Sequence, residues 1–305
     1  MARTPLFNRV QPGGVFAITD PGYTPGDVFF VHSGTGTDGA GYGKNPDAPV
    51  ATIDYAIGLC TANKSDVIYV MPGHNEGLGN AQITVDIAGI SIIGLGQGAD
   101  APRIDFDHAN ASIDITANGC RLENLRLLPS VTAVLIAIDV TADDTMLRKI
   151  VTLPGEDGAG VDEFAETIEI NVGSDRTFIE NCTFTQHASA AGVLSCVLIQ
   201  GASDGCVIRN CVMWTAGAGL VAPINGDTTL STNLLIENCV LTTDAEPGIE
   251  LLTGTTGVIR NTDIFGDLAT IAAATVADGM AHFRVRYVEV GNESDAVVKT
   301  ASIDD

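Results

Sequence analysis

The sequence predicts an all-β fold in which short parallel strands wind into a solenoid, and three observations predict it. A short apolar phrase, most copies of which end in Asn, recurs at intervals of roughly 23 to 32 residues, as in proteins built from stacked repeats. The copies are residues 92–94, 120–124, 146–150, 177–182, 206–211, 234–239 and 257–261. Each is too short for a helix and is typical of a buried parallel strand. The 34 glycines and the aromatic content of only 5% suit tight turns around a narrow interior.

The part of the chain before the repeats is predicted to have two segments. Residues 1–26 are rich in Pro and Gly and are predicted to form an extended arm. Residues 27–65 are predicted to contain a lead-in strand at 28–32, a glycine-rich loop at 34–46 and a short helix. The second segment would therefore form the entrance to the solenoid.

The short helix is predicted within residues 52–60. Ile53, Ala56 and Ile57 recur at helical spacing, and Thr52 is a favourable N-cap. A helix at this place would cover the open end of the coil, where the first strands otherwise expose unpaired backbone groups.

The solenoid itself is predicted to occupy residues 66–275, beginning with a strand at 66–73. Residues 276–305 are predicted to form a C-terminal strand and a tail. Within them, 282–290 alternate in polarity like one strand, and the last residues are polar. This end is expected to cap the stack or to pair with a neighbouring subunit.

The residue that ends each strand is predicted to form an asparagine ladder. Asn tolerates the left-handed backbone conformation of a sharp corner, and its side chain can hydrogen-bond to its counterpart on the next coil. The ladder residues are Asn124, Asn181, Asn210, Asn238 and Asn261. Cys182, Cys211 and Cys239 follow Asn in the same register and are expected to form an inward-facing column.

The residue before each of these corners alternates in charge from coil to coil. In chain order these residues are Glu123, Arg148, Glu180, Arg209, Glu237 and Arg260. Because neighbouring strands lie about 4.8 Å apart, each charge would lie between two opposite charges. A coil in the wrong register would bring like charges together, so we interpret this row as a structural ladder that sets the register.

Composition limits the partners and the compartment. The formal charge of −23, from 15 basic and 38 acidic residues, argues against nucleic acid or an anionic membrane as a partner. The seven cysteines include no C-x-x-C pair, which indicates buried free thiols and not a zinc site. The first ten residues lack the apolar core of a signal peptide, so we expect synthesis in a reducing cytoplasm.

The order of these elements resembles the pectate-lyase-like superfamily of right-handed parallel β-helices. The resemblance rests on the lead-in strand, the glycine-rich loop, the helix phrase at 51–57, the strand at 66–73 and the repeated coil phrase, and it covers about residues 26–275. It implies a single-stranded right-handed parallel β-helix with a short N-terminal capping helix. The superfamily includes polysaccharide lyases and hydrolases, and also bacteriophage tailspikes and virion decoration proteins that are commonly trimeric. A fold shared so widely does not assign a function.

No catalytic residue is assigned from the sequence. The resemblance implies an acidic calcium cluster with an Arg or Lys base for a lyase, and two or three converging carboxylates for a hydrolase. Arg148, Arg209 and Arg260 already belong to the charge ladder, and no histidine belongs to a recognisable nucleophile motif.

The longest interval between repeats contains an acidic, glycine-rich loop at 155–166. We interpret it as a solvated loop; the alternative is a calcium site with Asp157, Asp162 and Glu163 as candidate ligands. No other cofactor is expected. The single tryptophan, Trp214, is expected to pack or to contact another subunit, and the alternative for it is stacking on a sugar.

These observations favour a non-enzymatic structural protein of a bacteriophage virion. We expect a β-helical capsid decoration or cement protein, homotrimeric, made in the host cytoplasm and placed on the virion surface. The arm at residues 1–26 would bind the major capsid protein or another virion protein, because a segment without its own core is ordered chiefly by binding. Neither nucleic acid nor a membrane is expected as a partner.

The alternative is a carbohydrate-active β-helix enzyme, either a tailspike depolymerase or a polysaccharide lyase. It would use the acidic loop and Trp214 on an acidic or capsular polysaccharide, with calcium as its cofactor. A third interpretation, an adhesin or lectin, requires an export signal that the first residues do not show.

Overall fold

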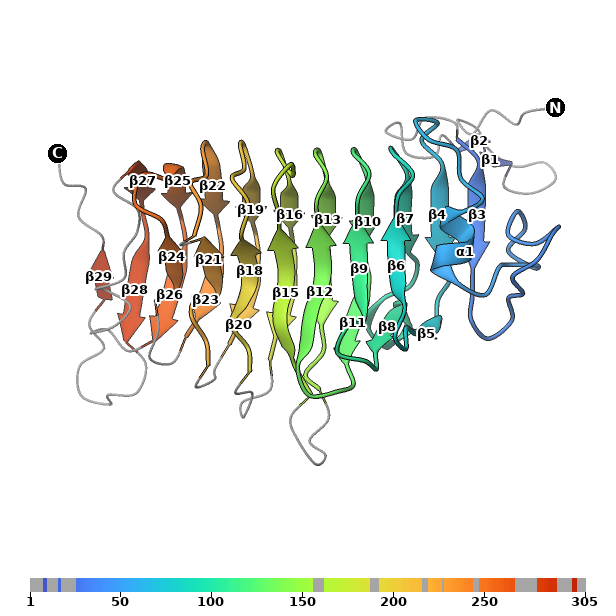
Figure 1. Ribbon diagram of the computed structural model, residues 1–305, viewed down its shortest axis with the longest axis horizontal. Coiled ribbons are helices and arrows are strands. Elements are labelled where there is room, and N and C mark those ends of the chain that lie inside the picture. Colours follow the sequence, from blue (N-terminus) through green and yellow to red (C-terminus); the bar gives the residue numbers. More distant parts are fainter. Residues whose placement is uncertain are drawn as a thin grey trace.

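The computed structural model describes residues 8–9, 16–17, 26–155, 162–186, 192–215, 219–226, 228–243, 247–266, 279–289 and 298–300. Over these residues the chain is almost entirely β, and parallel strands stack into one elongated solenoid (Figure 1). The predicted fold class, a parallel β-helix with a short helix near its N-terminal end, is therefore confirmed.

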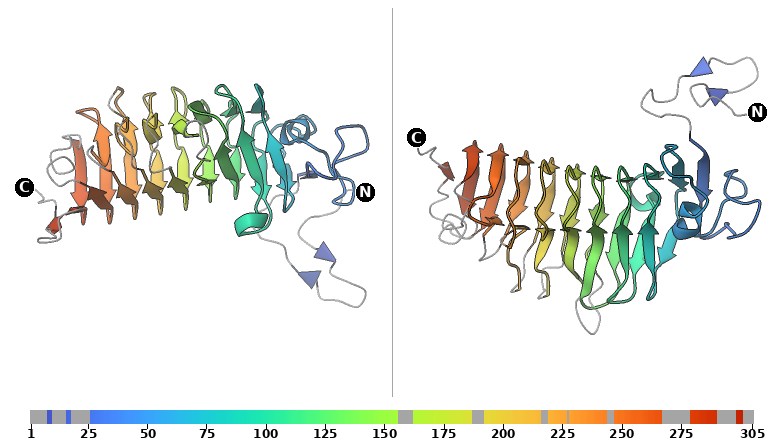
Figure 2. Two further views of the ribbon diagram at one scale, coloured as in Figure 1. Left: turned by 90° about the horizontal axis from the view of Figure 1, so that it is seen from below. Right: turned by 45° about the horizontal axis from the view of Figure 1, so that its top comes forward.

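Three sheets run along the solenoid, and the chain visits them in turn on successive coils (Figures 1 and 2). The first sheet contains β3 (Val28–Val31), β4 (Val67–Val70), β7 (Ser91–Gly94), β10 (Arg121–Glu123), β13 (Met146–Arg148), β16 (Phe178–Glu180), β19 (Val207–Arg209), β22 (Leu234–Glu237), β25 (Thr256–Arg260) and β27 (Gly279–Phe283). The second contains β5 (Asn75–Gly77), β8 (Arg103–Phe106), β11 (Arg126–Pro129), β14 (Val151–Thr152), β17 (Thr183–Thr185), β20 (Val212–Trp214), β23 (Val240–Thr242), β26 (Asp263–Gly266), β28 (Arg286–Glu289) and β29 (Val298–Thr300). The third contains β6 (Gln82–Val85), β9 (Ser112–Ile115), β12 (Val134–Val140), β15 (Phe164–Ile170), β18 (Ser195–Ile199), β21 (Ile224–Gly226) and β24 (Ile249–Leu251).

The corner between the first and second sheets is a left-handed residue on seven consecutive coils. Its φ angle lies between 51° and 59° at Asn124, Lys149, Asn181, Asn210, Asn238, Asn261 and Arg284. Asn is favoured there because it reaches this conformation at a lower cost than other residues with a Cβ atom, apart from Asp. This corner corrects one prediction: the run 282–290 is not a single strand, because the chain turns at Arg284 and continues as β27 and β28 in two different sheets.

The interior of the coil is filled by columns of apolar side chains. Alternate residues of each strand point inward, so equivalent positions on successive coils stack on one another. Phe106 and Phe164 pack edge to face with ring centroids 5.1 Å apart. Cys182, Cys211 and Cys239 are buried free thiols at equivalent positions directly after the corner. The expected inward-facing column of small apolar side chains is confirmed.

The helix α1 (Ile53–Ile57) lies at the N-terminal end of the coil and packs on β3, β4 and β6 (Figure 1). The hydroxyl of Thr52 accepts a hydrogen bond from the backbone N–H of Tyr55 at 3.3 Å, which is an N-cap. Ile53, Ala56 and Ile57 are buried, as their spacing predicts. Within the part of the chain that the structure describes, no helix is long and apolar enough to cross a membrane.

Two short segments before residue 26 are described. β1 (Asn8–Arg9) and β2 (Phe16–Ala17) pair as an antiparallel ladder. The rest of the predicted arm at 1–26 lies outside the described residues. At the other end, β27 and β28 pair in parallel with β25 and β26, so the coil continues beyond residue 275, and β29 adds to β28 as an antiparallel strand.

Candidate functional site

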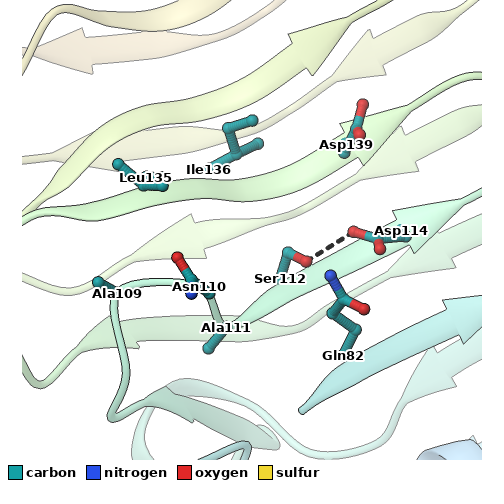
Figure 3. A pocket seen from close by; sticks show the side chains of 9 residues that line it. All are labelled: Gln82, Ala109, Asn110, Ala111, Ser112, Asp114, Leu135, Ile136 and Asp139. Atoms are coloured by element: carbon teal, nitrogen blue, oxygen red, sulfur yellow. Dashed lines mark hydrogen bonds between the residues drawn. The ribbon is translucent and has the colours of Figure 1, made fainter. Parts of the chain in front are cut away.

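A hollow of about 400 Å³ lies on the outer face of the third sheet, over β6, β9 and β12 (Figure 3). The polar residues that line it are Gln82, Asn110, Ser112, Asp114 and Asp139. The apolar ones are Ala109, Ala111, Leu135 and Ile136. The hollow therefore offers carboxylate, amide and hydroxyl groups among apolar side chains, which suits a small polar ligand.

Carboxylates lie opposite one another on three neighbouring strands of this sheet, and two of them line the hollow. The register pairs Asp114 of β9 with Asp139 of β12, and Asp139 with Glu169 of β15. We call these three residues the acidic row. Like charges directly opposite each other in a sheet are destabilising. The acidic row thus places like charges opposite one another, whereas the row of charged residues on the first sheet alternates in sign.

Two polar side chains relieve part of this repulsion. Ser112 donates its hydroxyl to Asp114 Oδ1 at 2.6 Å (Figure 3). The amide of Asn171 donates to Asp139 Oδ1 at 2.9 Å and to Glu169 Oε1 at 3.0 Å. Burial nevertheless raises the pKa of both Asp139 and Glu169, and the neighbouring carboxylate adds to the rise in each case.

A fourth carboxylate, Glu166, lies on β15 three residues before Glu169. Glu166 is 8% exposed, and Ser195 of β18 donates a hydroxyl hydrogen bond to it. Burial raises the pKa of Glu166 to about 7, the hydrogen bond from Ser195 opposes the rise, and Glu169 adds to it. A carboxyl group that keeps its proton near neutral pH can donate a hydrogen bond or act as a general acid, so this strand carries chemically distinct acids.

The candidate calcium ligands are only partly described. Asp157 lies outside the described residues. Glu163 is 4% exposed; its Oε1 accepts a hydrogen bond from the N–H of Gly192 at 2.7 Å, and its Oε2 is buried without a hydrogen-bond partner among the described residues. No three His, Cys, Asp or Glu side chains within the described ranges come together as a metal site. Calcium at Asp157, Asp162 and Glu163 stays a prediction.

The asparagine ladder residues occupy equivalent corners, and their side chains bond in two ways. Asn238 Nδ2 donates to Asn210 Oδ1 on the preceding coil at 3.2 Å. Asn124 instead donates to the carbonyl oxygens of Gly94 at 2.8 Å and Gly96 at 3.0 Å. Lys149 stands at the corner between Asn124 and Asn181, so the row of amides is interrupted there.

The six charged residues before these corners lie in one cross-strand row. The structure pairs them in register as Glu123 with Arg148, Arg148 with Glu180, Glu180 with Arg209, Arg209 with Glu237, and Glu237 with Arg260. Nitrogen to oxygen distances are 3.9 Å for Arg148 and Glu123, 3.0 Å for Arg148 and Glu180, 2.8 Å for Arg209 and Glu180, and 2.8 Å for Arg260 and Glu237. The six charged residues therefore lie in register and alternate in sign along the first sheet.

Trp214 lies on the outer face of the second sheet at the end of β20. Its side chain is 54% exposed and stands between Thr185 of β17 and Thr242 of β23. The hollow lies on the third sheet over β6, β9 and β12, whereas Trp214 lies on the second sheet at β20. Trp214 does not line the hollow, so the two features do not form one site.

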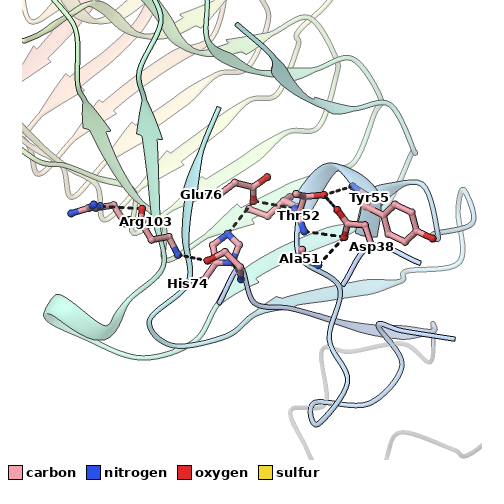
Figure 4. A network of polar contacts seen from close by, with 10 residues as sticks. Asp38, Ala51, Thr52, Tyr55, His74, Glu76 and Arg103 are labelled. Atoms are coloured by element: carbon pink, nitrogen blue, oxygen red, sulfur yellow. Dashed lines mark hydrogen bonds and ion pairs between the residues drawn. The ribbon is translucent and has the colours of Figure 1, made fainter. Parts of the chain in front are cut away.

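A buried polar network lies beneath the N-terminal helix (Figure 4). His74, 1% exposed, accepts a hydrogen bond at Nδ1 from the N–H of Ser33 at 3.0 Å, so its proton is on Nε2, which donates to Glu76 Oε2 at 3.0 Å. Glu76 also accepts the N–H of Ile53 at 3.1 Å, and the hydroxyl of Ser33 accepts the N–H of Asn75 at 3.0 Å. Because these groups satisfy one another and the first turn of the helix, the network is structural and is not a nucleophile triad.

Sequence reasoning did not identify the acidic row, although a signal exists. Asp114, Asp139 and Glu169 each stand between two apolar residues, in the phrases at 113–115, 138–140 and 168–170. An acidic residue in the middle of an apolar strand predicts an outward-facing carboxylate. What the sequence does not show is that the three phrases lie in adjacent coils and in register.

Comparison with known proteins supports the fold. No protein-family model matches the chain, and a search of the curated proteins finds no match. Among solved structures, a rhamnogalacturonan lyase matches with a TM-score of 0.56 and 13% identity, over 79% of this chain and 70% of that chain. A pectate lyase from Bacillus sp. N165 in complex with trigalacturonate matches with a TM-score of 0.54 and 14% identity, over 93% of this chain and 89% of that chain.

A protein described as Geobacillus virus E2 - ORF18 is also similar, with a TM-score of 0.36 and 11% identity over 78% of this chain and 57% of that chain. At this TM-score the match supports no conclusion about this chain. The two lyases share the pectate-lyase-like β-helix fold with this chain, and at 13% and 14% identity the likeness concerns the fold alone.

Proposed function

We propose that the chain is a non-enzymatic structural protein of a bacteriophage virion, a homotrimeric β-helix that decorates the capsid and is attached through its N-terminal arm. The observation that best supports this proposal is the uneven distribution of charge between the N-terminal segment and the rest of the chain. Residues 1–19 hold two of the 15 basic residues, Arg3 and Arg9, and none of the 38 acidic ones, so residues 20–305 hold 13 basic and 38 acidic residues and a formal charge of −25.

In this proposal the acidic solenoid and the basic N-terminal segment have different tasks. An acidic rod repels other acidic surfaces and keeps the particle soluble. A short basic segment with Leu6, Phe7 and Val10 can instead bind an acidic or apolar groove on another protein, and its ordering on binding costs part of the interaction energy. The partner in this proposal is the major capsid protein or another virion protein.

The regular solenoid supports a structural task as well. Three continuous parallel sheets make a stiff rod in which each coil contacts its neighbours. The hydrogen bonds and ion pairs at the corners join successive coils along the axis.

The test is attachment to virions of a phage whose genome carries this sequence, prepared without the protein. Full-length protein should co-sediment with the particles and have a native mass near three times 31.6 kDa. A chain that begins at residue 26 should keep the far-UV circular dichroism and melting temperature of the full chain and no longer co-sediment. The full-length double variant Arg3→Glu/Arg9→Glu is the control that keeps the arm's length and reverses its charge, and it should bind at least about tenfold more weakly.

Attachment of the truncated chain would refute the arm as anchor. The alternative, a carbohydrate-active enzyme, has one specific observation in its favour, the hollow with Asp139 and Asp114 side by side. Release of oligosaccharides from an acidic or capsular polysaccharide by the purified protein, with or without calcium, would favour that alternative over the structural task.

A further inference from the structure

The second sheet carries an uncharged outer face across four consecutive coils. On β14, β17, β20 and β23 the inward residues, Thr152, Phe184, Met213 and Leu241, are buried, so their neighbours point outward. The outward residues are Val151, Leu153, Thr183, Thr185, Val212, Trp214, Val240 and Thr242. We call these eight residues the uncharged face.

The uncharged face is unusual in a chain with a formal charge of −23. Over the same coils the first sheet has the charged row Glu180, Arg209 and Glu237. The third sheet has the buried Glu169 on the first of these coils and Glu250 on the last, with the uncharged Leu198 and Asn225 between them. A second copy that lay in register against the third sheet would bring Glu250 against Glu250, which costs binding energy. The uncharged face imposes no such penalty on two identical acidic chains.

Charged residues reappear where this face ends. Arg126 on β11 donates to the carbonyl oxygen of Ala99 at 3.0 Å, and Asp263 on β26 is paired with Arg286. These charges thus have partners within the chain. The uncharged stretch is bounded at both ends, as an association surface with a charged rim is.

Trp214 lies within this face and is 54% exposed. The Thr242 hydroxyl next to it is already engaged, since it donates to the carbonyl oxygen of Met213 at 3.2 Å and accepts the N–H of Thr215 at 3.2 Å. A sugar stacked on the indole needs hydrogen-bond partners close by, whereas an apolar protein surface does not. The Thr242 hydroxyl is engaged within the chain.

We propose that the uncharged face is the surface through which copies of this chain associate, with Trp214 as its central anchor. Strands in every copy repeat at about 4.8 Å, so outward rows of two copies that lie side by side have the same period and can interdigitate along several coils. A partner without a β-sheet surface would lack that match. Tryptophan at the centre of an interface commonly supplies a large share of the binding energy. The inference rests on the proposed homotrimer and names its contact surface.

The test uses Trp214 as its own probe, because it is the only tryptophan in the chain. In the assembled protein its fluorescence maximum should be blue-shifted, and dilution that lowers the native mass should shift the maximum to the red. Trp214→Glu should raise the concentration needed for assembly by roughly tenfold or more. Leu230→Glu is the matched control, because Leu230 is 48% exposed but lies between β21 of the third sheet and β22 of the first, and it should assemble like the original protein.

Trp214→Thr is the second variant if the charged one fails to fold, because Thr185 and Thr242 already occupy the same position on neighbouring coils. Normal assembly of a folded Trp214→Glu or Trp214→Thr protein would overturn the inference, and so would a water-exposed emission maximum in the trimer. A shift of emission by oligosaccharides at unchanged native mass would also overturn it, in favour of a sugar platform. Particle attachment through the arm is read separately by co-sedimentation, so the proposed function can survive a failure here.

Discussion

At the scale of single residues, the corner of each coil combines two devices. The corner residue is Asn on five of seven coils and adopts a left-handed φ on all seven. The residue before it is Glu or Arg in strict alternation over six coils, with nitrogen to oxygen distances of 2.8 to 3.9 Å along the row. The pKa of Glu123 is lowered: although burial is the largest single influence and acts to raise it, bonds from Arg121 and Lys149 and the charge of Arg148 outweigh burial.

Reversal of one charge in the middle of this row should lower stability. Glu180 lies between Arg148 and Arg209, so Glu180→Arg removes two ion pairs and creates two like-charge contacts. We expect the free energy of unfolding to fall by about 1 to 2 kcal/mol, a modest value because both arginines are partly exposed. Urea unfolding followed by circular dichroism measures it.

Two further variants distinguish the effect of like-charge contacts from the effect of losing an ion pair. Glu180→Gln should lose less than Glu180→Arg, since it removes attraction without adding repulsion. Addition of Arg209→Glu to Glu180→Arg should restore stability only in part, because residue 209 then faces Glu237. A Glu180→Arg protein as stable as the original would show that the row does not set the register.

At the scale of elements, neighbouring strands of the third sheet place like charges opposite one another. Asp114, Asp139 and Glu169 stand opposite one another on β9, β12 and β15, and Glu166 is buried on β15. Asn171 and Ser195 hydrogen-bond to these carboxylates but do not neutralise them. Two of these carboxylates, Asp114 and Asp139, line the hollow on this sheet.

The raised pKa of Glu166 predicts the direction of the pH dependence. Its pKa is about 7 in the folded state, above its ordinary value of 4.5, so the folded chain binds this proton more tightly than the unfolded chain does. The free energy of unfolding should therefore fall as pH rises from about 4.5 to about 7, by at most about 3 kcal/mol. Glu166→Gln should flatten the curve in that window, as measured by urea unfolding at a series of pH values.

The control is Asp144, a carboxyl group whose pKa is shifted in the opposite direction. Hydrogen bonds from Arg176 lower the pKa of Asp144, so the stability that Asp144 contributes is lost only as pH falls below its ordinary value of 3.8. Asp144→Asn should leave the slope between pH 5 and pH 7 unchanged. An unaltered slope in Glu166→Gln would contradict the assignment.

At the scale of the whole molecule, the charge is spread along a rod. The ion pairs at the corners act over about 3 to 4 Å, whereas the repulsion among 38 acidic residues acts over the length of the solenoid. Salt screens the second effect more than the first, because the Debye length at 0.1 M salt is about 10 Å.

Added salt should therefore stabilise the protein. We expect the melting temperature, measured by calorimetry at one fixed protein concentration, to rise between about 10 mM and 500 mM sodium chloride. Potassium chloride should have the same effect, since screening depends on ionic strength and not on the cation. A melting temperature that falls with salt would mean that the corner ion pairs outweigh the net repulsion.

The sequence by itself determined the features that repeat from one coil to the next. The all-β parallel solenoid, the left-handed Asn corners, the buried cysteine column and the capping helix behind Thr52 could all be predicted, because each depends on residues close in sequence or at equivalent places in adjacent coils. Local polarity also predicted one strand at 282–290, and there the corner at Arg284 prevailed over the alternation.

The second and third sheets differ in how far their outward rows depend on the tertiary structure. Thr185, Trp214 and Thr242 each stand four residues after the corner Asn181, Asn210 or Asn238, so the repeated Asn already marks their register and strand pairing confirms it. Only the tertiary structure decided that Asp114, Asp139 and Glu169 share a face, because they are 25 and 30 residues apart and turns of unequal length separate them. A one-residue slip would turn every side chain to the opposite face, so the acidic row is fixed by strand pairing.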